Sequence, residues 1–144
     1  MDEVTLEDII VTPLKRIPTL GGDILHALKE TDLGFSGFGE VYFSWVKQGA
    51  IKAWKCHKNM TLNLVVPIGE VNFVFHKING INNFRTEKIG EKRYVRLTVP
   101  AGIWFGFQGN SDVSSLLMNI ANIPHDPSEV VHKKETEFNY NWNA

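Results

Sequence analysis

The sequence has little that would tie this protein to disulfide chemistry, a membrane or nucleic acid. Its 144 residues include one cysteine, Cys56, so no internal disulfide forms, and a lone thiol fits a reducing compartment such as the cytoplasm. No apolar run approaches the roughly 20 residues of a transmembrane helix, and the acidic N-terminal segment lacks the pattern of a signal peptide. The net charge of −1 excludes a global field that attracts nucleic acid or anionic lipid. An anionic ligand would have to be held by a local cluster of Lys and Arg.

The chain also lacks the 3.6-residue periodicity of long helices, and only 127–134 fits a short one. Short strand-like segments alternate with turn residues instead, and strands are predicted over 40–46, 50–57, 61–67, 71–77, 93–99, 103–109 and 115–120. Residues 14–17 are expected to be extended. Residues 23–29 fit either a helical turn or a hairpin strand, because Gly21 and Gly22 precede them. The pattern predicts an all-β sandwich or barrel in one domain over 1–144.

Two residues with proton chemistry lie close together on the predicted strand 50–57. Alternate side chains on a strand share a face, so Lys55 and His57 are expected to project the same way. An unperturbed His titrates near neutral pH and suits a general base. A Lys acts as a base only where its surroundings lower its pKa by several units. Cys56 is expected to turn away from both neighbours and to pack as a small hydrophobe.

Further polar and aromatic residues are candidates for ligand contacts. A diphosphate needs two or more cations, and the candidates are Lys52, Lys58 and Arg16. Trp104 is a candidate to stack on a base or sugar, with packing as the alternative. Asn63 shares a strand face with Thr61 and Val65, so it is predicted to meet either a ligand or a buried polar partner. Tyr42 is a candidate acid, with a structural role for its hydroxyl as the alternative.

The remaining histidines and the C-terminal tail are given lesser roles. His26 and His125 are candidates for the rim of a pocket, although a turn and a helix cap at 125–127 are favoured. His76 and His132 are expected to lie away from the site. The tail over 135–144 is rich in aromatic residues, unlike a disordered end. It is therefore predicted to pack on the barrel or on a partner subunit.

Two segments resemble the sequence motifs of the cupin fold, a small β-barrel. Gly49 and Gly69 bound the first, and Pro100-Ala-Gly102 begins the second. Metal-binding cupins carry two His and a Glu in the first motif and a final His in the second. The corresponding positions here hold Lys55, His57, Leu62 or its neighbour, and Phe105. One remaining ligand of four is too few for a transition metal, so the resemblance implies a cupin without a metal or other cofactor.

Longer stretches resemble the dTDP-4-dehydrorhamnose 3,5-epimerase group, especially its shorter relatives in surface-polysaccharide clusters such as those for O-antigen. The resemblance lies in residues 13–18, 21–23, 38–44, 51–58, 99–104 and 119–127. It implies a jelly-roll barrel, a homodimer, and a nucleotide-diphosphate 4-keto-6-deoxy sugar as ligand. The family's reaction inverts a carbon beside the keto group: a base removes the proton, the enolate is stabilised, and an acid returns a proton on the other face.

The family's catalytic residues carry over only in part. Its base is a His in an Arg-Gly-Leu-His-like run, and the best alignment places Lys52 on the Arg and Lys55 on the base. A slip of one step gives the base role to His57 instead. The family's Tyr acid falls at Met118 or Asn119, neither of which is an acid, and Asn119 is assigned to substrate binding. No Asp that would support the base is evident.

Three activities therefore stay open. They are the epimerase, a ketoisomerase of the same fold that moves the keto group to a neighbouring carbon, and a cupin that binds a sugar nucleotide without turnover.

Overall fold

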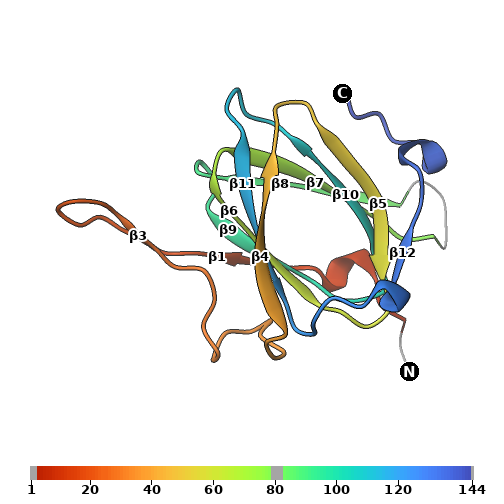
Figure 1. The fold of residues 1–144 in the computed structure, drawn as a ribbon, viewed down its shortest axis with the longest axis horizontal. Coiled ribbons are helices and arrows are strands. Elements are labelled where there is room, and N and C mark those ends of the chain that lie inside the picture. Colours follow the sequence, from red (N-terminus) through yellow and green to blue (C-terminus); the bar gives the residue numbers. More distant parts are fainter. Residues whose placement is uncertain (1–2, 79–82, 144) are drawn as a thin grey trace.

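Two five-stranded antiparallel sheets face each other in the computed structural model (Figure 1), which describes residues 3–78 and 83–143. The first sheet runs in the order β1 (Ile10–Pro13), β9 (Val95–Val99), β6 (Leu62–Ile68), β11 (Ser115–Ala121) and β4 (Glu40–Val46). The second runs β12 (Val130–His132), β5 (Ile51–His57), β10 (Trp104–Gly109), β7 (Glu70–His76) and β8 (Phe84–Gly90). The described part of the chain has no α-helix, only the 3-10 turns η1 (Leu6–Asp8), η2 (Pro127–Glu129) and η3 (Glu135–Glu137). No helix in these described ranges is long and apolar enough to cross a membrane.

The predicted strands are confirmed, and the differences from the prediction lie at the sheet edges. All seven predicted strands are present with bounds that shift by at most two residues. The predicted helix over 127–134 is wrong beyond η2, because Val130 and the residues after it pair with β5 instead. Residues 23–29 take the hairpin alternative: β3 (Ile24–Leu25) pairs with β2 (Arg16–Ile17). The edge strands β1 and β8 were not predicted.

The core fills the space between the two sheets. Large aromatic side chains come from the second sheet and branched aliphatic ones from the first, including Phe73, Phe75, Phe105, Leu64, Leu97 and Leu117. These residues alternate with others on each strand because successive side chains point to opposite faces. Burying one such side chain stabilises the fold by about 1.5–3 kcal/mol, so the core holds the two sheets together.

Two segments cover the outer faces of the sheets. A loop over 27–34 covers the first sheet, where fully buried Arg96 donates to Asn63 Oδ1 (3.0 Å), to Ala27 O (2.8 Å) and to Asp32 (3.2 Å). The aromatic tail covers the second sheet, where Phe138 lies 5.2 Å from Trp54 between ring centroids. The prediction that the tail packs on the barrel is confirmed.

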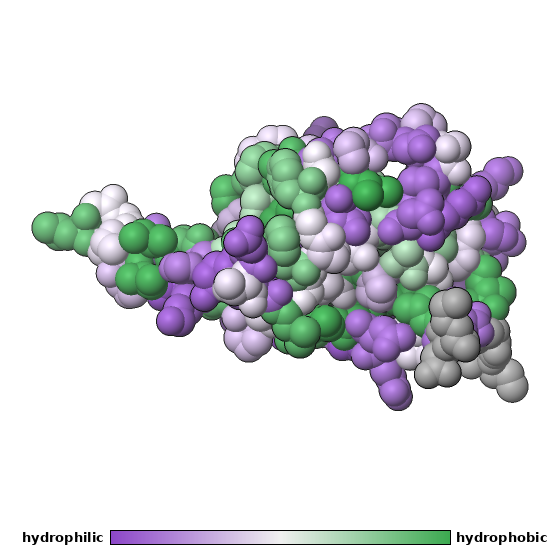
Figure 2. Space-filling model, turned by 90° about the horizontal axis from the view of Figure 1, so that it is seen from below, coloured by the Kyte–Doolittle hydropathy of each residue, from purple (hydrophilic) through white to green (hydrophobic). Residues whose placement is uncertain are grey.

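A hairpin projects from this barrel and carries apolar side chains into solvent. It is formed by β2 and β3, and it extends well beyond the two sheets (Figure 1). Ile17, Leu20 and Ile24 on this projection are exposed, and Figure 2 shows hydrophobic patches at its tip and along it, with hydrophilic residues nearer the barrel. A two-stranded hairpin is at best marginally stable alone, so this segment is suited to contact another molecule.

Candidate active site

Two adjoining cavities between the sheets form one cleft. Their volumes are about 420 Å³ and about 430 Å³. Both are lined by Tyr42, Lys55 and His132, which therefore stand where the cavities meet. The cleft has the size and the mixed apolar and polar lining of a small-molecule site.

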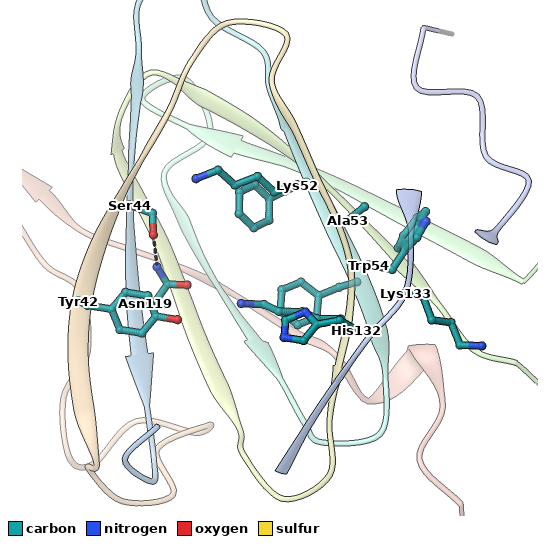
Figure 3. Close-up of a pocket in the computed structure, with 11 residues that line it drawn as sticks. Tyr42, Ser44, Lys52, Ala53, Trp54, Asn119, His132 and Lys133 are labelled. Carbon is teal, nitrogen blue, oxygen red and sulfur yellow. Dashed lines mark hydrogen bonds between the residues drawn. The ribbon is translucent and has the colours of Figure 1, made fainter. Parts of the chain in front are cut away.

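One wall of the cleft comes from β4 and β11. Tyr42 and Ser44 point inward because they alternate with Val41 and Phe43, which are exposed on the outside of the sheet. Asn119 on β11 pairs in register with Tyr42, and its Nδ2 donates to Ser44 Oγ at 3.4 Å. Figure 3 places these groups across the cleft from Lys52 and His132. This wall thus offers a phenol, an amide and a hydroxyl.

The opposite wall comes from β5, β10 and β12. Lys55 and His57 both line the second cavity, so the predicted shared face is confirmed. Lys52 joins them because β5 has one extra residue opposite β10: Phe105 pairs with Lys55, whereas Phe107 pairs with Lys52. Strict alternation would have turned Lys52 outward.

The two lysines on this wall differ in their surroundings. Lys52 is exposed, and its Nζ donates to Trp45 O at 3.3 Å. Lys55 Nζ lies 5.4 Å from the centroid of the Phe105 ring, and it has no hydrogen bond or ion pair within the described residues. The amine of Lys55 is therefore unpaired among the described residues and lies over the ring of Phe105.

A buried carboxylate holds His57. Glu129 Oε1 is hydrogen-bonded to His57 Nδ1, while Oε2 accepts from the backbone N–H groups of Asn59 and Met60 at 3.0 Å each. His57 is 8% exposed and Glu129 is 3% exposed. An ionised carboxylate only accepts hydrogen bonds, so Nδ1 carries the proton and Nε2 keeps its lone pair. Nε2 is buried and has no partner among the described residues.

The electrostatics of the cleft suit proton transfer at neutral pH. Burial lowers the pKa of His57, and this outweighs the hydrogen bond that His57 donates to Glu129, which would raise it. Burial alone would raise the pKa of Glu129, but the hydrogen bonds from His57, Asn59 and Met60 lower it overall. Burial and then the charge of Glu40 raise the pKa of Tyr42. The site thus holds a neutral imidazole, an ionised carboxylate and a protonated phenol.

Lys55 is shifted in the direction that favours its neutral form. Burial, and then the positive charge of Lys52, lower its pKa, although the charge of Glu129 opposes this shift. A neutral amine is a nucleophile and a base, whereas an ammonium is neither.

Several residues predicted from the sequence do not line the cleft. Arg16 lies on the projecting hairpin, with its guanidinium carbon 5.6 Å from the Tyr94 ring centroid. Lys58 Nζ donates to Ser128 O at 3.2 Å. Asn63 faces the loop over 27–34, where its side chain bonds the buried Arg96 and Thr98. Trp104 packs on the tail. Binding roles for these four residues find no support in the geometry of this chain.

The structure also corrects the reading of the other histidines. His132, expected to lie away from the site, lines both cavities because β12 places it opposite Lys55. His125 lines the second cavity, and the neighbouring Asp126 caps η2 by accepting from Ser128 N. His26 lies beyond β3, where its carbonyl accepts from Tyr94. His76 stacks on Phe84 with centroids 4.4 Å apart.

Glu129 is the functional residue that sequence reasoning missed. It lies 72 residues from His57 in sequence, at the end of η2. The signal was the turn chemistry of Asp126-Pro127, which predicts a short turn but gives no direction for the acidic side chain after it. Within residues 3–78 and 83–143 no three His, Cys, Asp or Glu side chains gather closely enough to hold a metal ion. The metal-free reading stays a prediction from the motif.

Known proteins resemble this chain in structure. A scan against protein-family models finds no match, and neither does a search of curated proteins. The structure of a dTDP sugar isomerase from Desulfovibrio desulfuricans G20 is 31% identical, with a TM-score of 0.85 over 91% of this chain and 87% of that one.

Two more distant structures share the fold. The sugar 3,4-ketoisomerase QdtA from Thermoanaerobacterium thermosaccharolyticum, in complex with TDP, is 16% identical with a TM-score of 0.74 over 90% of each chain. The 3,5-epimerase RmlC from Legionella pneumophila, in complex with dTDP-4-keto-L-rhamnose, is 15% identical with a TM-score of 0.78 over 92% of this chain and 76% of that one. The predicted jelly-roll fold and the resemblance to the epimerase group are confirmed. This chain belongs to the RmlC-like cupins, the family of the dTDP sugar isomerase that it matches at 31% identity.

Proposed function

We propose that this protein is a metal-independent epimerase that acts beside the keto group of a nucleotide-diphosphate 4-keto-6-deoxy sugar in the synthesis of a surface polysaccharide. The observation that carries the proposal is a held base facing an acid across one cleft. Glu129 fixes His57 on one wall, and Tyr42 stands on the other. Inversion at carbon needs groups on both faces of the reacting atom, and the two walls supply them.

The reaction begins at the unpartnered nitrogen of His57. Nε2 takes the proton from the carbon next to the ketone, and Glu129 stabilises the imidazolium that forms. Lys55, which lines the cleft, binds the keto oxygen of the substrate and stabilises the enolate. The hydroxyl of Tyr42 then donates a proton to the opposite face, which inverts the carbon. The raised pKa of Tyr42 keeps it protonated for this step.

Substrate binding draws on the remaining polar groups of the cleft. Lys52 supplies a positive charge at the wall, and Asn119 and Ser44 supply hydrogen-bonding groups across from it. His132 adds a donor where the cavities meet. The relatives with dTDP or a dTDP sugar in their structures support a nucleotide sugar as the ligand class.

A ketoisomerase is the second candidate. It needs one base that moves a proton between neighbouring carbons on one face. The cluster of His57, Lys55 and His132 on a single wall favours it. The requirement for Tyr42 separates the two reactions, because only inversion uses the opposite wall.

Deuterium exchange tests the proposal. The protein is incubated in heavy water with dTDP-, CDP-, GDP- and UDP-linked 4-keto-6-deoxy sugars, and carbon-bound deuterium is followed by mass spectrometry and NMR. We expect uptake that is lost in His57→Asn and unchanged in Lys88→Arg, which lies exposed on β8. Tyr42→Phe should lose inversion yet retain exchange at the same carbon.

The product and the labelled carbon decide between the candidates. A product whose keto group has moved would replace the epimerase with the ketoisomerase. Binding of a nucleotide sugar without any deuterium uptake would contradict both reactions and favour a cupin without turnover.

The exposed apolar surfaces support a homodimer. Val41, Phe43 and Trp45 on the outside of edge strand β4 are 46–60% exposed, and the hairpin adds Ile17, Leu20 and Ile24. Sedimentation equilibrium of the wild type and Phe43→Glu tests this assembly, and a monomeric wild type would contradict it.

The single free cysteine supports a reducing compartment such as the cytoplasm.

A further inference from the structure

The amine of Lys55 lies in the cleft without a hydrogen-bond or ion-pair partner among the described residues. It stands where the two cavities meet, and the face of Phe105 lies 5.4 Å below it. A lysine used only for charge normally finds a carboxylate. Glu129 contributes to its electrostatics, but both Glu129 oxygens already accept hydrogen bonds from His57, Asn59 and Met60.

We propose that Lys55 forms a covalent iminium with the keto carbon of the nucleotide sugar, so that the carbon next to it is inverted through an enamine in place of a free enolate. The inference rests on the proposed function and defines how the same cleft activates the ketone. Lys52 is unsuited to this role because it is exposed and its Nζ is bonded to Trp45 O.

The chemistry balances without an added co-reactant. The Nζ lone pair attacks the keto carbon, and one amine proton passes to the oxygen to give a carbinolamine. The oxygen takes a second proton from solvent and leaves as water, which produces a protonated iminium; the later hydrolysis to the free amine returns this proton to solvent. His57 Nε2 then removes the neighbouring carbon-bound proton, and the C–H electrons form the enamine.

The return path restores every group. Tyr42 donates a proton to the opposite face of the enamine carbon and regenerates the iminium. A water molecule then hydrolyses it, which releases the epimerised ketone and the free amine. His57 gives up its proton and Tyr42 regains one, so one water is released and one is consumed in each cycle.

The geometry of β5 suits the two steps. Lys55 and His57 share a strand face, with neighbouring Cα atoms on that face about 6.6–7 Å apart along the strand. Their side chains can thus address adjacent carbons of one sugar ring. The protonated iminium withdraws electrons from the neighbouring C–H bond, as an ammonium held near the keto oxygen does more weakly. The neutral form of the amine, favoured by burial and Lys52, supports the attack.

Loss of the keto oxygen distinguishes an iminium from an enolate. dTDP-4-keto-6-deoxyglucose labelled with ¹⁸O at the ketone is incubated with the protein in heavy water, and the rates of ¹⁸O loss and deuterium uptake are measured together. A protein-free sample gives the background hydration rate. We expect protein-dependent ¹⁸O loss at least as fast as deuterium uptake, since each covalent cycle exchanges the oxygen.

Reductive trapping and a conservative variant supply independent readouts. Sodium cyanoborohydride should give a sugar-nucleotide adduct that peptide mapping places on Lys55. Lys55→Arg keeps the positive charge but has no nucleophilic amine. We expect turnover to fall by about 100-fold or more, while dTDP binding and the thermal unfolding temperature stay at wild-type values. Lys88→Arg is the matched control.

The outcomes separate the two hypotheses. Deuterium uptake without ¹⁸O loss above background and without an adduct would overturn the iminium while leaving the epimerase intact. Turnover preserved in Lys55→Arg would likewise show that Lys55 acts through its charge alone. No deuterium uptake and no adduct with this sugar or the others of the panel would overturn both proposals.

Discussion

Replacing Glu129 by Gln should disable the base through its tautomer. The carboxylate now accepts from His57 Nδ1 and from the N–H groups of Asn59 and Met60. A Gln side chain has one acceptor and one donor group. Its oxygen will face the two amides, because its NH₂ group would otherwise point at two N–H donors. The NH₂ group then donates to Nδ1, which moves the imidazole proton to Nε2 and removes the lone pair that the proposed proton transfer needs.

The expected magnitude follows from these lost functions. General-base catalysis contributes about 10²–10⁴-fold, so kcat should fall by about that factor in Glu129→Gln while substrate binding changes little. The carboxylate charge also raises the pKa of His57. Its removal should lower that pKa further and shift the acid limb of the pH–rate profile to lower pH. A purely structural role for Glu129 would move neither the tautomer nor this limb.

The assay combines exchange kinetics with nitrogen NMR. Deuterium uptake gives kcat and its pH dependence, and ¹⁵N shifts of labelled His57 report which ring nitrogen carries the proton. Glu91→Gln is the matched control, since the Glu91 carboxylate also accepts a backbone N–H, that of Gly69 at 2.8 Å, but bonds no histidine. A kcat within about threefold of the wild type, or an unchanged tautomer, would refute the reasoning.

Three further predictions concern stability. Arg96→Met should lower the free energy of unfolding by about 2–4 kcal/mol in urea titration, because a buried hydrogen-bonded network loses its centre; a loss no larger than that of the exposed control Arg93→Met would contradict it. Phe138→Ala should cost about 1–3 kcal/mol and alter Trp54 fluorescence, since the two rings pack together; unaltered fluorescence would argue against that packing. The lowered pKa of His57 means that the unfolded chain binds the proton first as pH falls below the ordinary value of 6.5, so stability should decline there. His57→Asn should flatten this decline, and an equally steep slope would assign it to another group.

The strands were predictable because local chemistry specifies them. Turn residues separate apolar segments, and alternation places Lys55 and His57 on one face of β5. The edges were not predictable from such local patterns. β12 forms because an edge of β5 needs hydrogen-bonding partners, and that pairing joins residues far apart in sequence. His132 enters the cleft only as a consequence of this pairing.

Asn63 and Lys52 show two other limits of pattern reading. The sequence indicated that Asn63 meets either a ligand or a buried polar partner, and Arg96 with Thr98 is that partner. Burial of a polar side chain does not reveal which face of a sheet it occupies, and the loop over 27–34 buries the outer face here. Lys52 faces the cleft because of a bulge, and a one-residue irregularity reverses every inference from alternation.

The hydrogen-bond partners of Lys55 and His57, which alignment does not show, favour His57 as the base. A base needs a lone pair directed at the substrate and a group that stabilises its protonated form. Glu129 gives His57 both, since it holds the proton on Nδ1 and carries the opposite charge. Among the described residues no carboxylate is bonded to Lys55, whose unpaired amine lies beside an aromatic surface. In the proposed reaction the two tasks are divided, because His57 moves the proton and Lys55 activates the ketone. Glu129, at the end of η2, is hydrogen-bonded to His57 on β5, so the fold provides the partner that the proposed base requires.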